Sequence, residues 1–94
     1  MSPRPLVLVP GACLGGWAWR DVADQLRALG HDVYPVTLTG LGDRVHLADE
    51  RVDLDTHVAD VLGVLDYEDL SDAVLVGHSY AGLVVAGAAD RRPE

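Results

Sequence analysis

One stretch near the end of the chain constrains the fold more than any other. Residues 73–76 have the length and composition of a buried β-strand, and residues 83–89 are small and apolar enough for a helix packed closely against a sheet. Between them, Gly77, Ser79 and Ala81 match the pattern G-x-S-x-G, with alanine in place of the last glycine. The sequence therefore predicts a strand that turns sharply into a helix at Ser79.

The small residues around Ser79 have a steric reason. A serine at such a turn takes a strained backbone conformation, so the residues two before and two after it must be small, as Gly77 and Ala81 are. Gly82 follows and is grouped with them as support for the turn. The turn exposes the hydroxyl, and the helix that begins there offers unpaired N–H groups that favour negative charge. Residues 77–82, here called the elbow, thus predict a nucleophile at Ser79. A tight turn that merely contains glycine and serine is the alternative.

The first third of the chain predicts a strand, a loop and a helix. Residues 6–9 form a continuous apolar run, which is typical of a parallel strand buried on both faces. Residues 10–16, here called the glycine loop, follow. A helix should come next, because apolar side chains recur on an approximate 3.6-residue period at Trp17, Val22, Leu26 and Leu29. Gly30 should end this helix.

The middle of the chain predicts a second strand and a second helix. Residues 32–37 have strand composition, and their proline favours an edge position. Residues 38–54 are polar and glycine-punctuated, which indicates a long loop. Asp53 or Asp55 should cap the helix that follows. Its buried face is marked by Val58, Val61, Leu62 and Leu65.

The alternation of strands and helices predicts an α/β fold. We expect three parallel strands in the order 2-1-3 with helices on both faces, because crossovers between parallel strands are right-handed. Ligands bind such sheets at the carboxyl ends of the strands where the order reverses, here between the first and third strands. The glycine loop and the elbow should therefore face each other across one crevice.

That geometry predicts an oxyanion hole. Acyl transfer uses two backbone donors aimed at the developing oxyanion. We expect one at the N–H of Tyr80, directly after the nucleophile, and the other at Ala12 in the glycine loop, where Gly11 allows close approach. A glycine loop that only reverses the chain direction is the alternative.

These residues also carry a family resemblance. Residues 6–19 (LVLVPGACLGGWAW), followed by residues 77–82 (GHSYAG), resemble the α/β-hydrolase superfamily, in the branch of small esterases, methylesterases and plant hydroxynitrile lyases. The resemblance implies a carboxylic-ester hydrolase that acylates Ser79 with a small, fairly apolar ester and needs no metal or organic cofactor. The related lyases carry threonine at the position of Gly11, so glycine here resembles the esterases.

The resemblance also implies that catalytic partners are missing. Family members run to well over twice this length, with an acid and a histidine after the nucleophile in the order Ser, Asp, His. We therefore expect residues 1–94 to be the N-terminal portion of a single α/β-hydrolase domain. By itself this chain should be nearly inactive, because a serine hydroxyl needs a neighbouring base. A lyase of the same fold and a non-catalytic, hydrolase-like binding protein or truncated remnant remain alternatives.

The four histidines do not supply an evident base. His78 neighbours Ser79, but successive side chains at a sharp turn diverge. His31 and His57 are expected on the surface, and His46 is at most a substrate contact.

Composition limits the partners and the compartment. The net charge is −8, with 15 Asp and Glu against 7 Lys and Arg, which argues against nucleic acid or an anionic membrane. The expected partner is the small ester that the family resemblance implies. No apolar run approaches the roughly 18 residues of a membrane span. Cys13 is the single cysteine, too few for an internal disulfide or a metal pair, so a cytoplasmic location is expected. The sequence sets no oligomeric state.

Overall fold

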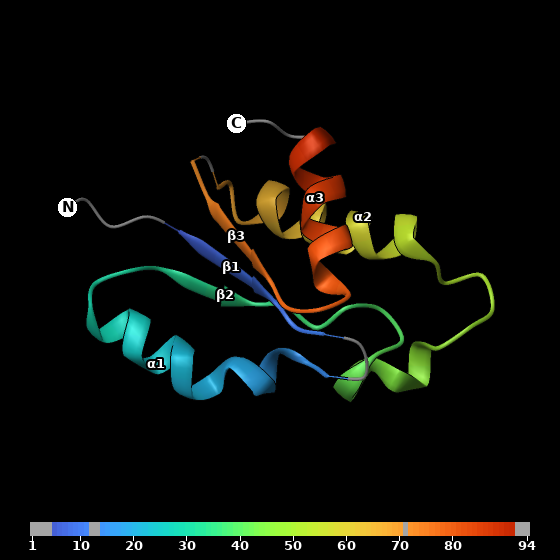
Figure 1. The fold of residues 1–94 in the computed structure, drawn as a ribbon, viewed down its shortest axis with the longest axis horizontal. Coiled ribbons are helices and arrows are strands. Elements are labelled where there is room, and N and C mark those ends of the chain that lie inside the picture. Colours follow the sequence, from blue (N-terminus) through green and yellow to red (C-terminus); the bar gives the residue numbers. More distant parts are fainter. Residues whose placement is uncertain (1–4, 12–13, 71, 92–94) are drawn as a thin grey trace.

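Strands and helices alternate along the chain in a computed structural model, which describes residues 5–11, 14–70 and 72–91 (Figure 1). Within these residues the regular elements are β1 (Leu6–Val9), α1 (Arg20–Ala28), β2 (Val33–Pro35), α2 (Leu54–Tyr67), β3 (Val74–Gly77) and α3 (Ala81–Arg91). Two short 3-10 helices, η1 (Gly16–Trp19) and η2 (Gly42–Leu47), precede α1 and α2. The predicted order of elements is confirmed.

The three strands form one parallel sheet in the order β2-β1-β3. In the register, Leu6 of β1 lies opposite Val33 of β2 and Val74 of β3, and Val9 lies opposite Gly77. The carboxyl ends of β1 and β3 therefore meet at one edge of the sheet. The predicted strand order is confirmed, and it brings the glycine loop and the elbow to the same end of the sheet.

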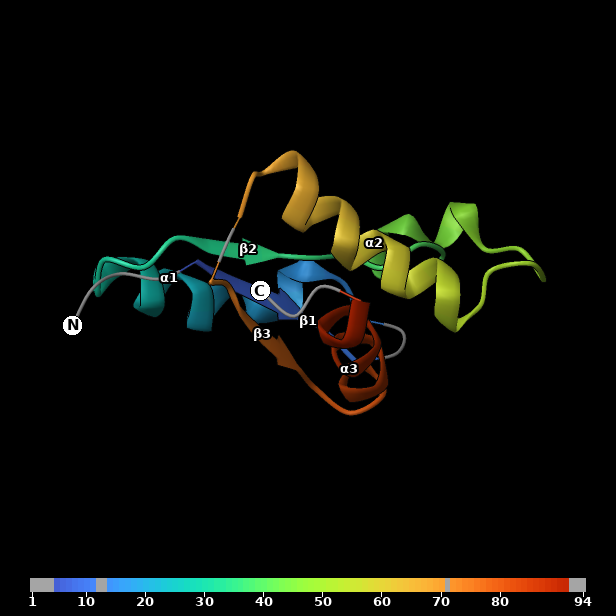
Figure 2. The same cartoon turned by 90° about the horizontal axis from the view of Figure 1, so that it is seen from above.

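Helices cover both faces of the sheet, as predicted. α1 lies on one side, whereas α2 and α3 lie on the other (Figures 1 and 2). The side chains of β1 alternate between the two layers: Leu8 packs with Ala23 and Val33 beneath α1, and its neighbours Val7 and Val9 pack beneath α2 and α3. That second layer is completed by Val36, Leu38, Val58, Val61, Leu65, Ala81, Val84 and Ala88. β1 is thus buried on both faces, which explains its unbroken apolar sequence.

The ends of the elements differ in detail from the prediction. β2 spans three residues rather than six, and the segment read as a loop contains η2. The first helix begins as a 3-10 turn that holds Trp17, and it ends just before Gly30, whose φ of 93° is the left-handed conformation of a C-terminal cap. α2 begins with a capping box in which Asp53 and Thr56 satisfy each other's backbone N–H groups.

Candidate active site

Ser79 sits in a strained turn between β3 and α3. Its φ is 59°, in the left-handed region that non-glycine residues enter at a cost of about 1–2 kcal/mol. The turn is held at both ends, because the N–H of His78 donates to the carbonyl of Val9 (3.3 Å) and the N–H of Gly82 donates to the carbonyl of Ser79 (2.9 Å). The serine itself is exposed. The local geometry is that of a strand-turn-helix with its hydroxyl-bearing residue presented to solvent.

Only some of the small residues in the elbow are required by close contacts. A Cβ added at Gly77 would lie 2.7 Å from the carbonyl oxygen of Ala81, a separation that real Cβ atoms do not adopt. Ala81 is itself fully buried. A Cβ added at Gly82, in contrast, would meet no atom of the described residues within 4 Å. The structure thus gives a steric reason for glycine at residue 77 and none at residue 82.

The glycine loop packs directly against the elbow. A Cβ at Gly11 would lie 3.1 Å from Nδ1 of His78 and 3.5 Å from Cβ of Ser79, so the two loops touch at the carboxyl ends of β1 and β3. Ala12, the expected second oxyanion donor, and Cys13 lie outside the described residues.

A small apolar pocket opens beside this contact, on the α1 side of the sheet. Its volume is about 250 Å³, and it is lined by Pro10, Gly11, Leu14, Ala18, Trp19, Val22 and His78. The indole N–H of Trp19 is buried and has no hydrogen-bond partner among the described residues, whereas Trp17 is 52% exposed. Trp19 therefore packs near the glycine loop, whereas the side chain of Trp17 is half exposed.

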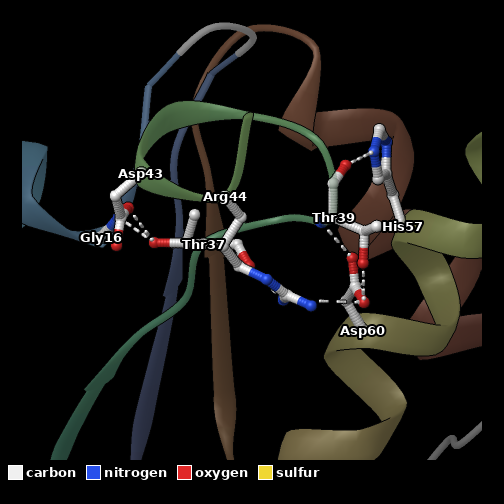
Figure 3. A network of polar contacts seen from close by, with 7 residues as sticks. All are labelled: Gly16, Thr37, Thr39, Asp43, Arg44, His57 and Asp60. Carbon is white, nitrogen blue, oxygen red and sulfur yellow. Dashed lines mark hydrogen bonds and ion pairs between the residues drawn. The ribbon is translucent and has the colours of Figure 1, made fainter. Parts of the chain in front are cut away.

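Polar contacts hold the far end of the glycine loop. The N–H of Gly16 donates to Oγ1 of Thr37 (2.8 Å), and that hydroxyl donates to the carboxylate of Asp43 (3.0 Å) (Figure 3). Gly15 lies so close to Asp43 and Trp17 that an added Cβ would clash with both side chains. Glycine at residue 15 is thus explained by close approach.

The expectation that His57 lies on the surface is wrong. Its side chain is 7% exposed, with Nδ1 2.8 Å from the hydroxyl of Tyr80 and Nε2 2.9 Å from the carbonyl oxygen of Thr39. The cause is helix phase: residues 57, 61 and 65 are four apart, so His57 continues the buried stripe of Val61 and Leu65 by one turn. The capping box, which sets where α2 begins, was the signal that could have located it.

Asp60 holds the segment after β2 against α2, on the face of the helix that also carries His57. Its carboxylate accepts hydrogen bonds from the N–H (2.6 Å) and the hydroxyl (2.7 Å) of Thr39 (Figure 3). Arg44 lies 4.0 Å from this carboxylate and donates to the carbonyl of Thr37 (2.9 Å). Sequence reasoning missed this network, although an aspartate three residues from His57 on a helix that buries this face was a usable signal.

Burial affects the chemistry of Tyr80. Desolvation, and secondarily the negative charge of Asp53, raise the pKa of its hydroxyl above the ordinary value. The phenol therefore stays protonated at neutral pH and can donate a hydrogen bond.

The remaining candidate residues stay apart from the elbow. Within the described ranges, no hydrogen bond joins the hydroxyl of Ser79 to a histidine, and no group of three His, Cys, Asp or Glu side chains is placed to hold a metal ion. His46 is exposed on η2. The acidic residues around the end of α2 and the start of β3 are all exposed, namely Asp66, Glu68, Asp69 and Asp72. Among the described helices, none is long and apolar enough to cross a membrane.

A parallel sheet covered by helices, with a serine in the left-handed backbone conformation where a strand turns into a helix, is the arrangement of an α/β-hydrolase. The chain matches the alpha/beta hydrolase family over residues 6–92, and it belongs to that family.

Within this family, the chain is similar to several individual esterases and hydrolases. The chain is 55% identical over 85 residues to a carbendazim hydrolyzing esterase of Nocardioides sp. (strain SG-4G), covering 90% of this chain and 35% of that protein. It is 33% identical to methylesterase 8 of Arabidopsis thaliana, covering 100% of this chain and 35% of the relative. An extracellular alpha/beta-hydrolase from a Paenibacillus species superposes with a TM-score of 0.83 at 31% identity, over 97% of this chain and 36% of that one. The chain thus spans little more than a third of these relatives.

Proposed function

We propose that residues 1–94 carry the nucleophile and the oxyanion donors of a carboxylic-ester hydrolase. The observation that carries the proposal is the left-handed backbone of Ser79, exposed at the start of α3 and packed against Gly11. In the reaction, Oγ of Ser79 attacks the ester carbonyl and loses its proton to a base. The alcohol then leaves with a proton, and water hydrolyses the acyl-enzyme to free acid and serine.

The amides of Tyr80 and Ala12 would stabilise the oxyanion. Each such donor typically contributes about 10² to 10³ in rate. The base and the acid of the catalytic triad would come from outside this sequence, in the order Ser, Asp, His. We therefore expect the 94-residue chain alone to be nearly inactive. The mechanism requires no metal or organic cofactor, and a cytoplasmic location remains a prediction.

A small, apolar ester is the substrate class that the chain supports. The pocket beside the elbow holds about 250 Å³ and has apolar walls that include Leu14 and Val22. The relatives named as a carbendazim hydrolyzing esterase and as a methylesterase support an ester with a small alcohol group such as methanol.

A chimera tests the proposal without relying on the isolated chain. Residues 1–94 would replace the matching segment of the Nocardioides esterase, and hydrolysis of p-nitrophenyl acetate, methyl esters and carbendazim would be measured. We expect turnover that falls by about 10⁶ in kcat with Ser79→Ala, together with loss of fluorophosphonate labelling. Ser71→Ala is the matched control, since it removes the same hydroxyl outside the elbow. Equal turnover by the Ser79→Ala chimera would refute the proposal.

A lyase on the same fold is the second class to test. A threonine at residue 11 would place its Cβ 3.1 Å from Nδ1 of His78, so the elbow as it stands favours glycine there. We therefore expect the chimera to release no cyanide from a cyanohydrin. Substrate binding without labelling of Ser79 would instead favour a non-catalytic binding protein.

A further inference from the structure

His57 joins three segments behind the elbow. It lies in the first turn of α2, and its ring bonds Tyr80 on one side and Thr39, after β2, on the other. We propose that His57 is a positioning residue for the proposed reaction: it clamps the ring of Tyr80 and so fixes the backbone N–H that would bind the oxyanion. The inference rests on the proposed function and adds to it a role for a residue outside the expected catalytic triad.

The partners of His57 select one tautomer of the neutral imidazole. A carbonyl oxygen can only accept, so Nε2 must donate its proton to Thr39. Nδ1 of the neutral ring is then an acceptor, and the hydroxyl of Tyr80, 2.8 Å away, donates a hydrogen bond to it. The raised pKa of Tyr80 keeps that proton in place. Both ring nitrogens are engaged, so His57 cannot serve as the base for Ser79 while these bonds hold.

The other side of the clamp is rigidly held. Thr39, whose carbonyl oxygen accepts the hydrogen bond from Nε2, itself donates two hydrogen bonds to Asp60, three residues along α2 from His57 (Figure 3). Arg44 lies near that carboxylate, and the Thr39 carbonyl is therefore a fixed acceptor and not a mobile loop atom. The orientation of the imidazole is set by α2 and by the segment after β2 before it meets Tyr80.

The clamp acts on the residue that follows the nucleophile. The ring of Tyr80 meets the imidazole edge-on, with centroids 5.6 Å apart and planes at 80°. Its carbonyl accepts the N–H of Leu83 (3.0 Å) in the first turn of α3. Tyr80 is thus held at the tip of its side chain and at its backbone, which limits rotation of the peptide between Ser79 and Tyr80. Preorganised donors are worth more than donors that must reorient during the reaction.

Nitrogen-15 NMR of the chimera that carries residues 1–94 tests the contact between His57 and Tyr80 directly and needs no catalysis. At neutral pH we expect His57 to carry its proton on Nε2, with Nδ1 shifted as a hydrogen-bonded acceptor. Tyr80→Phe should shift Nδ1 towards the value of a free imine nitrogen and speed exchange of the residue 80 amide proton. A proton on Nδ1, or nitrogen shifts unchanged by Tyr80→Phe, would overturn the proposal. Neither result depends on Ser79 or on ester hydrolysis.

Kinetics of the chimera tests the consequence for catalysis. Tyr80→Phe and His57→Phe should each lower kcat about fivefold to tenfold, the range for one hydrogen bond, with KM nearly unchanged. His57→Gln should recover most of the loss, because glutamine keeps one donor and one acceptor. The double variant should lose no more than a single one, since both remove the same bond.

The controls separate positioning from general stability. His46→Gln makes the same change at an exposed histidine and should leave kcat unaltered. Multiplicative losses in the double variant, or a loss confined to KM, would contradict positioning through the shared bond. Failure of the proposed function is a different result, namely a chimera whose activity survives Ser79→Ala.

Discussion

Residues 77 and 82 are both glycines of the elbow, yet their surroundings differ. At Gly77 the position of a Cβ is already occupied by the backbone of Ala81, because the chain doubles back there between β3 and α3. At Gly82 the same atom would point into open space on the exposed face of α3. One glycine is demanded by a close approach, and the other only lowers the helix propensity of its turn.

We predict opposite effects from the same substitution at these two positions. Gly77→Ala should lower the free energy of unfolding by about 1–3 kcal/mol, because backbone must move to admit the methyl group. Gly82→Ala should raise the free energy of unfolding by about 0.5–1 kcal/mol, as alanine does in an exposed helix. Urea denaturation of both variants checks this. Equal destabilisation would mean that residue 82 is also sterically restricted.

Among the elements, α2 carries the polar side chains that contact both the elbow and the segment after β2. Its N-terminus is fixed by Asp53, whose side chain accepts the N–H of Thr56 (3.0 Å). The same turn carries His57, which contacts the elbow, and the next turn carries Asp60, which contacts the segment after β2. By fixing where α2 begins, the cap also fixes the directions in which His57 and Asp60 point towards their partners.

The cap predicts a loss of stability in acid. The backbone N–H and then the hydroxyl of Thr56 lower the pKa of Asp53 below the ordinary 3.8. Stabilisation by a carboxyl with a lowered folded-state pKa is complete above the unfolded-state value and is lost as the pH falls through the folded-state value. Asp53→Asn still caps the helix but does not titrate, so it should reduce the loss of stability at low pH. Thermal unfolding measured over a range of pH checks this. Glu50→Gln, at an exposed residue outside the capping box, should leave the loss of stability at low pH unchanged.

At the scale of the whole molecule, β3 is an edge. Within the described residues it pairs only with β1, and its side chains Val74, Leu75 and Val76 are half-buried. An apolar strand with an unpaired edge is a template for association. Leu83, 61% exposed on α3, adds apolar surface to the following helix.

We therefore predict that the 94-residue chain associates in solution. Val74→Lys should reduce this association, because Val74 belongs to neither core cluster and a charge at an edge strand opposes pairing. Leu29→Lys, at a 74% exposed residue directly after α1, is the matched control and should have little effect. Sedimentation velocity over a range of concentrations measures both. A monomer at all concentrations would be the contrary outcome.

The sequence by itself determined the order of the elements, the parallel sheet and the place of the elbow. Local patterns suffice for these features: apolar runs mark the strands, periodicity marks the helices, and the handedness of crossovers leaves few ways to connect them. Gly77 and Ala81 were predictable because the turn at Ser79 is a local steric problem. The contact between Gly11 and the elbow followed from the strand order alone.

Only the tertiary structure decided how polar side chains support that site. His57 bonds Tyr80 across 23 residues and Thr39 across 18, and Thr39 reaches Asp60 across 21. The period of α2 could place His57 and Asp60 on its buried face, but no local pattern identifies the partners that they meet there. Their burial is favourable only because folding brings a matching donor or acceptor to each of them, and that match exists in three dimensions and not along the chain.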